Sequence, residues 1–118
     1  MYKQYFIDLC NVIKTFYEAT KKNESDIIAN DIANTVIDII DSSLRDLVLH
    51  DKDLATCIET LIESFSFISN FTSELTVSHH NEIADSAKKH FDYITAWGTI
   101  LENSLEEIQE SQRRNIDE

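Results

Sequence analysis

The 118 residues of this chain include no proline and a single glycine, and 22 acidic side chains stand against 10 basic ones. Because proline and glycine punctuate hairpins and long loops, their near absence argues against a β fold and predicts one domain of helices joined by short polar turns. A formal net charge of −12 makes unaided binding to nucleic acid or to an anionic membrane surface unfavourable, and it favours a basic protein partner.

Apolar residues in the first half of the chain recur at steps of three and four, which is the spacing of amphipathic helices. The first helical segment is predicted from Tyr2 to about Lys21, and the second from about Asp26 to His50. The polar stretch 50–53 then predicts a turn, in which Asp51 or Asp53 caps the helix that follows.

The third segment begins at Leu54, and its end is predicted only to within Asn70 to His80, because this polar stretch has no glycine to stop a helix. The fourth runs from His79 to about Ser111 and carries the longest apolar strip. Such a helix is too long to bury its apolar side alone, so the other segments are expected to cover it. Gly98 marks a point where a neighbouring helix is expected to approach closely. The strip consists of Ile83, Ala87, His90, Ile94, Trp97, Leu101, Ser104 and Ile108.

Four amphipathic segments with short connections predict an all-α fold, an up-down-up-down antiparallel four-helix bundle. The bundle is expected to occupy residues 1–112, with 113–118 as a frayed C-terminal tail. The alternative is a pair of helical hairpins that complete their core in a homodimer, because the fourth helix is longer than its neighbours can cover. No run of about 18 apolar residues and no signal peptide is recognisable, which predicts a cytoplasmic protein without a membrane segment.

Cys10 and Cys57 lie on or beside apolar helical faces, which predicts two free thiols that act as small hydrophobic side chains. Whether they form a bridge depends on the distance between two helices, which the sequence leaves open. The chain has no Glu-x-x-His, no Cys-x-x-Cys and no glycine-rich phosphate loop, so we expect neither a metal nor another cofactor. His90 lies within an apolar strip and is interpreted as a packed side chain.

The segment Arg45-Asp-Leu-Val-Leu-His50 resembles the Arg-x4–6-His signature of HEPN-domain ribonucleases. In that family, arginine and histidine from two paired subunits act on RNA, so the resemblance implies a dimeric ribonuclease that uses Arg45 and His50. A local interpretation stands beside it, in which Arg45 pairs with Asp41 four residues earlier and His50 sits at a helix C-terminus. Since a charge of −12 opposes RNA binding, we expect a protein that is not an enzyme.

The distribution of carboxylates is more informative than any motif. Glutamates at i and i+4 near the end of the fourth helix repel one another and the helix dipole, so local stability does not explain them. Either they form a solvated face that keeps the protein soluble, or they bind a basic partner. The candidate partner-binding residues are Asp31, Asp38, Asp41, Glu102, Glu106, Glu107 and Glu110.

These features predict a small acidic module that binds a basic partner, such as a nuclease or another nucleic-acid-binding protein, and blocks or escorts it. Inhibitors, immunity proteins and anti-defence proteins belong to this class, and carboxylates in place of phosphates would act by nucleic-acid mimicry. A third possibility, besides this module and the ribonuclease, is a structural or adaptor bundle such as a secretion chaperone. Its contact surface would be apolar, and its binding would not depend on salt.

Overall fold

The computed structural model describes residues 2–23, 27–78 and 82–117, and these ranges contain four α-helices and no strand. The helices are α1 (Tyr2–Asn23), α2 (Ile27–Val48), α3 (Leu54–Ser78) and α4 (Glu82–Asp117). Each forms because its apolar residues recur with the helical period and bury one side. The predicted starts of the second and fourth segments, at Asp26 and His79, lie outside the described residues.

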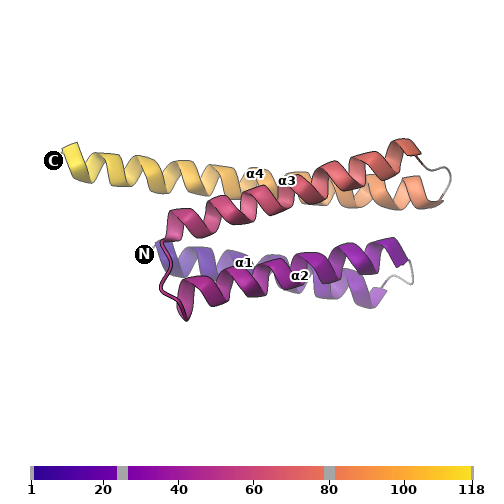
Figure 1. The fold of residues 1–118 in the computed structure, drawn as a ribbon, viewed down its shortest axis with the longest axis horizontal. Coiled ribbons are helices and arrows are strands. Elements are labelled where there is room, and N and C mark those ends of the chain that lie inside the picture. Colours follow the sequence, from indigo (N-terminus) through magenta and orange to yellow (C-terminus); the bar gives the residue numbers. More distant parts are fainter. Residues whose placement is uncertain (1, 24–26, 79–81, 118) are drawn as a thin grey trace.

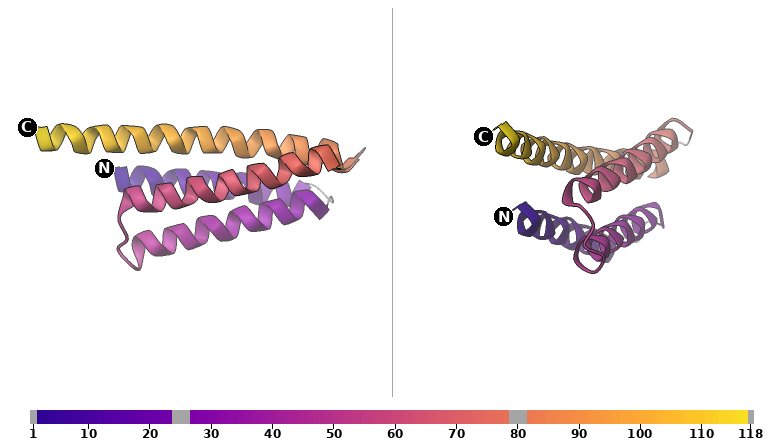
Figure 2. Two further views of the ribbon diagram at one scale, coloured as in Figure 1. Left: turned by 45° about the horizontal axis from the view of Figure 1, so that its top comes forward. Right: turned by 60° about the vertical axis from the view of Figure 1, so that its left-hand side comes forward.

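The four helices run alternately up and down along one long axis, so each is antiparallel to the next (Figure 1). The hairpin of α1 and α2 packs beneath the hairpin of α3 and α4, and the right-hand view in Figure 2 shows the two layers. The predicted all-α antiparallel four-helix bundle is thus confirmed. Its dimensions are 56 × 25 × 18 Å, and the longest matches a helix of 36 residues.

The core draws side chains from all four helices of one chain, and completion of the core by a second copy stays a prediction. The strip predicted on α4 is buried at Ala87, His90, Ile94, Leu101, Ser104 and Ile108. On α3 the inward position near the end belongs to Thr72, whose hydroxyl donates to the carbonyl oxygens of Ile68 and Ser69 at 3.0 and 2.9 Å. Phe71 beside it faces outward and is half exposed.

Aromatic rings fill the contact between α1 and α4. The Phe16 ring lies edge-on to Tyr93 and Trp97, with ring centroids 5.0 and 5.7 Å apart, and to Tyr17 at 5.1 Å. Such edge-to-face pairs add about 0.5–1.5 kcal/mol each beyond the area that they bury. They join the first hairpin to the second on this side of the bundle.

The turn between α2 and α3 is closed without glycine. Asp51 takes the left-handed conformation with φ of 50°, which aspartate tolerates better than most residues, and the Lys52 amide donates to the Asp46 carbonyl at 3.0 Å. Asp53 then caps α3, since its carboxylate accepts from the Thr56 amide at 3.1 Å. The predicted turn and the Asp53 cap are confirmed.

The C-terminal end of α4 extends past the ends of the other three helices (Figure 1). The helix continues to Asp117, beyond the predicted end near Ser111. Within this last stretch Arg114 forms an ion pair with Glu110, four residues earlier on the same face. The division into a domain of 1–112 and a frayed tail of 113–118 stays a prediction.

Gly98 does not mark a close approach of two helices, and that expectation was wrong. A Cβ atom at this position would meet no other atom within 4 Å. The glycine instead lies on an open part of α4, where nothing in its surroundings requires a missing side chain.

Replacing Gly98 with alanine is therefore expected to stabilise the protein. The methyl group enters open space, and alanine in a helix interior is favoured over glycine by about 0.5–1 kcal/mol. Urea unfolding followed by circular dichroism measures the free energy of unfolding. A loss of stability in Gly98→Ala would mean that another chain segment occupies the space beside α4.

Cys10 and Cys57 are both free and buried, as the sequence predicts. Burial raises the pKa of the Cys10 thiol to about 12, with a smaller contribution from Cys57, and burial likewise raises the pKa of Cys57. Both thiols stay protonated at neutral pH in the folded protein.

A thiol whose pKa is raised in the folded state stabilises that state below its unfolded pKa, and the contribution is lost as pH rises toward 12. At pH 8 the folded protein therefore has much less Cys10 thiolate than the unfolded chain. We expect Ellman's reagent to react with both cysteines at once in urea and very slowly in the native protein. Fast native labelling at pH 8 would contradict the buried positions.

Candidate protein-binding groove

A groove of about 790 Å³ lies between α2 and α3. The two helices lie close at their connecting turn, and α3 then diverges from α2 toward the right of Figure 1. We call this cavity the α2–α3 groove. It is lined by Asp31, Ile32, Asn34, Thr35, Asp38 and Ile39 of α2 and by Ser64, Phe67, Ile68, Phe71 and Leu75 of α3.

The floor and one wall of the groove are apolar. Ile32 and Ile68 are buried at its base, while Phe67 is 74% exposed and Phe71 is 50% exposed along the α3 edge. Two phenylalanines four residues apart lie on the same helical face. A contiguous exposed apolar surface rimmed by polar residues is typical of a site that binds another molecule.

The α2 edge of the groove is acidic. Asp31 and Asp38 are both exposed, and their seven-residue separation places them about 10.5 Å apart along the helix. Within the described part of the chain, no cation lies within ion-pairing distance of either carboxylate. Both are therefore available to a positively charged partner.

The neutral polar groups of the groove are already engaged within the chain. The Thr35 hydroxyl donates to the Asp31 carbonyl at 2.8 Å, and the Ser64 hydroxyl donates to the Thr60 carbonyl at 3.0 Å. The Asn34 side-chain oxygen accepts from Lys21 Nζ at 2.7 Å. The groove therefore offers a ligand mainly apolar surface and two carboxylates.

Toward the turn the groove narrows into a second hollow of about 120 Å³, which shares Ile39 and Ser64 with it. Asp46 and Lys52 line this hollow and approach each other to 3.9 Å. The negative charge at the narrow end is thus partly balanced, while the wide end carries the two unpaired aspartates.

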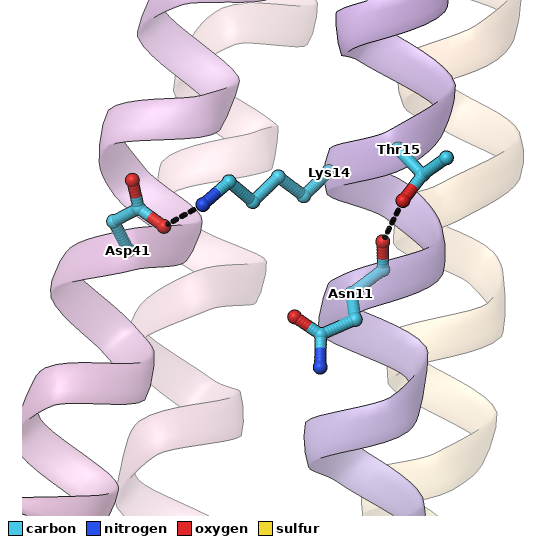
Figure 3. Close-up of polar contacts among 4 residues, drawn as sticks. All are labelled: Asn11, Lys14, Thr15 and Asp41. Atoms are coloured by element: carbon cyan, nitrogen blue, oxygen red, sulfur yellow. Dashed lines mark hydrogen bonds and ion pairs between the residues drawn. The ribbon is translucent and has the colours of Figure 1, made fainter.

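Asp41, the third aspartate predicted on this helix, has a structural contact. Its carboxylate accepts a hydrogen bond from Lys14 Nζ at 2.8 Å, and Figure 3 shows the lysine reaching from α1 to α2. This hydrogen bond raises the pKa of Lys14. The ion pair that the structure shows for Asp41 joins two helices and differs from the local pair with Arg45 that the spacing suggests.

The four glutamates predicted on α4 do not share a surface with Asp31 and Asp38. Glu102 lines a separate groove of about 280 Å³ between α3 and α4, next to Gly98. Glu106 and Glu107 are exposed on α4. Glu110 accepts a hydrogen bond from Arg114 at 2.8 Å, which lowers the pKa of the Glu110 carboxyl. The seven predicted acidic residues thus lie along the α2–α3 groove, at the contact between α1 and α2, and along α4.

Arg45 and His50, the residues of the ribonuclease interpretation, are both exposed near the turn after α2. The Arg45 carbonyl accepts from the Leu49 and His50 amides at 2.8 and 3.3 Å, so the contact that joins them is part of the helix end. Neither residue lines any of the three cavities described above. Catalysis by these two residues stays a prediction.

The described ranges lack the features of two other kinds of site. No group of three or more histidine, cysteine, aspartate or glutamate side chains there is placed to hold a metal ion. None of the described helices is long and apolar enough to cross a membrane.

Phe67 is the residue of the groove that sequence reasoning missed. At about 100° per residue it points about 200° away from Phe65, which is buried in the core, so it is an aromatic residue out of phase with the apolar strip of α3. That mismatch was the available signal. A large apolar side chain on the polar side of an amphipathic helix marks an exposed apolar patch.

The pair Phe65 and Phe67 offers a matched test of this geometry. Phe65→Ala is expected to lower the free energy of unfolding by about 3–5 kcal/mol, because it empties a buried site. Phe67→Ala is expected to change it by less than about 0.5 kcal/mol, because the ring is largely exposed. Urea denaturation of both variants decides the matter, and equal losses would show that the Phe67 ring belongs to the core.

Comparisons of the chain with protein-family models, with curated proteins and with solved structures found no match. The function must therefore be inferred from the geometry and charge of the grooves.

Proposed function

We propose that this chain is a protein-interaction module that binds a basic protein partner in the α2–α3 groove and blocks or escorts it. The observation that carries the proposal is the combination, in one groove, of exposed Phe67 and Phe71 with the unpaired carboxylates of Asp31 and Asp38. Apolar contacts supply most of the binding free energy at such sites, and charge steers the approach and selects the partner.

The net charge of the whole chain also favours a basic partner. A net charge of −12 creates a negative field that attracts cations and repels nucleic acid and anionic lipid. Inhibitors and immunity proteins of nucleases, and anti-defence proteins, have partners of this kind. Because Asp41 is held by Lys14, α2 presents two available carboxylates, so a groove with an acidic edge is better supported than a row that mimics phosphates.

A second candidate, an adaptor or chaperone with an apolar contact surface, is favoured by the 74% exposure of Phe67. The two candidates differ in their response to salt. Steering by Asp31 and Asp38 weakens as ionic strength rises, whereas an apolar interface is little affected.

The proposal is tested by capturing partners from extracts of the organism that encodes the chain, with three forms of the protein as bait. Asp31→Lys/Asp38→Lys reverses the groove edge, and Glu106→Lys/Glu107→Lys makes the same change in net charge elsewhere on the surface. We expect the first variant to lose the partner that the unaltered chain captures, and the second to keep it with slightly greater sensitivity to salt.

Two results would contradict the proposal. If the groove variant captured the same partner with the same dependence on salt, the acidic edge would have no part in binding. If only the α4 variant lost the partner, the binding surface would be the glutamates of α4. Circular dichroism of each variant establishes that it is folded.

A further inference from the structure

We infer that the ligand of the α2–α3 groove is an amphipathic α-helix of the partner, with two basic residues seven positions apart beside an apolar strip. This inference rests on the function proposed above and specifies the partner's binding segment. It draws on four features of the groove, which are its length, its hydrogen-bonding groups, its apolar edge and the spacing of its charges.

The length of the groove suits a short helix. Its lining on α3 extends from Ser64 to Leu75, which is about 16 Å at 1.5 Å per residue, and its lining on α2 from Asp31 to Ile39 is about 12 Å. A helix of about three turns fills this length. Short amphipathic helices in apolar grooves are a recurring mode of peptide recognition.

The polar groups of the groove favour a helix over an extended segment. The side chains of Thr35, Ser64 and Asn34 already form hydrogen bonds within the chain. An extended peptide would bring backbone N–H and C=O groups that find few partners along the apolar α3 edge. A helix satisfies the backbone groups between its two ends internally, and it meets the groove with side chains.

The apolar edge also has the period of a helix contact. Phe67 and Phe71 rise one turn apart on α3, and Leu75 continues the row one turn later. A partner helix that lies along α3 meets this row with apolar residues at i, i+3 or i+4, and i+7.

Within the chain, α1 already contacts α2 through two lysines that are seven residues apart. Lys14 and Lys21, seven residues apart on α1, reach across to Asp41 and Asn34, seven residues apart on α2, at 2.8 and 2.7 Å. The spacings match because two helices packed side by side rise equally per residue. This α1–α2 contact shows that α2 accepts a neighbouring helix through paired contacts two turns apart.

Asp31 and Asp38 repeat the seven-residue spacing on the side of α2 that faces α3. A helix in the groove with two lysines or arginines seven residues apart on one flank aligns with both carboxylates. A second copy of the chain is disfavoured as the ligand, because each copy carries a charge of −12.

A library of 16-residue random peptides displayed on phage, selected on the intact chain, tests the inference without a known partner. We expect the selected sequences to share apolar residues at helical spacing and two basic residues seven positions apart. The best peptide, made synthetically, is expected to gain helicity on binding, as circular dichroism shows. Moving one basic residue by two positions is expected to weaken binding about fivefold.

Variants of the protein locate the binding site of the selected peptide. We expect Phe67→Ala/Phe71→Ala and Asp31→Lys/Asp38→Lys each to weaken binding about tenfold, and Glu106→Lys/Glu107→Lys to change it by less than about threefold. Fluorescence anisotropy of the labelled peptide measures all three, and circular dichroism establishes that each variant is folded.

The outcomes separate this inference from the proposed function. Basic peptides that bind without helical order, or that ignore the phenylalanine variant, would overturn the helix inference and leave a basic partner in place. Selected peptides without basic residues, which bind the Asp31→Lys/Asp38→Lys variant as well as the unaltered chain, would overturn both.

Discussion

The packing of α4 against the other three helices is the constraint on which the rest of the structure depends. Its buried strip runs from Ala87 to Ile108, α3 packs along it, and α1 meets it through the ring of Phe16. Small buried residues, Ala29 and Ala33 on α2 and Ala87 on α4, are of the size that lets helices approach closely, and α2 contacts α4 as well as α1 and α3. With α4 covered in this way, α2 and α3 remain in contact near their turn and diverge beyond it, and the groove is the consequence.

The acidic residues of the protein have different roles in this geometry. Lys14 holds Asp41 and Arg114 holds Glu110, so some of the acidic residues stabilise contacts between or within helices. Asp31 and Asp38 have no such contact in the described structure, and they border a groove whose other edge carries the exposed rings of Phe67 and Phe71. Unpaired carboxylates contribute little to stability, and exposed phenylalanines contribute little to the core. Folding does not require these carboxylates and phenylalanines to lie in one groove, whereas a surface that binds a basic partner does.

Most of the fold follows from sequence because it depends on local periodicity. The helical spacing of apolar residues gave the four helices, their antiparallel order and the buried strip of α4, and the Asp53 cap followed from local hydrogen bonding. The groove did not follow, since it depends on how far α3 diverges from α2, which is set by packing between segments. For the same reason, the pairing of Asp41 with Lys14 and the open surroundings of Gly98 appear only in three dimensions.

The central claim, that the α2–α3 groove is the binding surface, is tested most directly by mapping NMR chemical-shift changes as the captured partner, or a peptide derived from it, is added to the labelled chain. We predict the largest changes at Ile32, Phe67 and Phe71 along the groove, with little change on α4 near Glu106. Changes concentrated on α4, or spread evenly over the acidic surface, would contradict the claim.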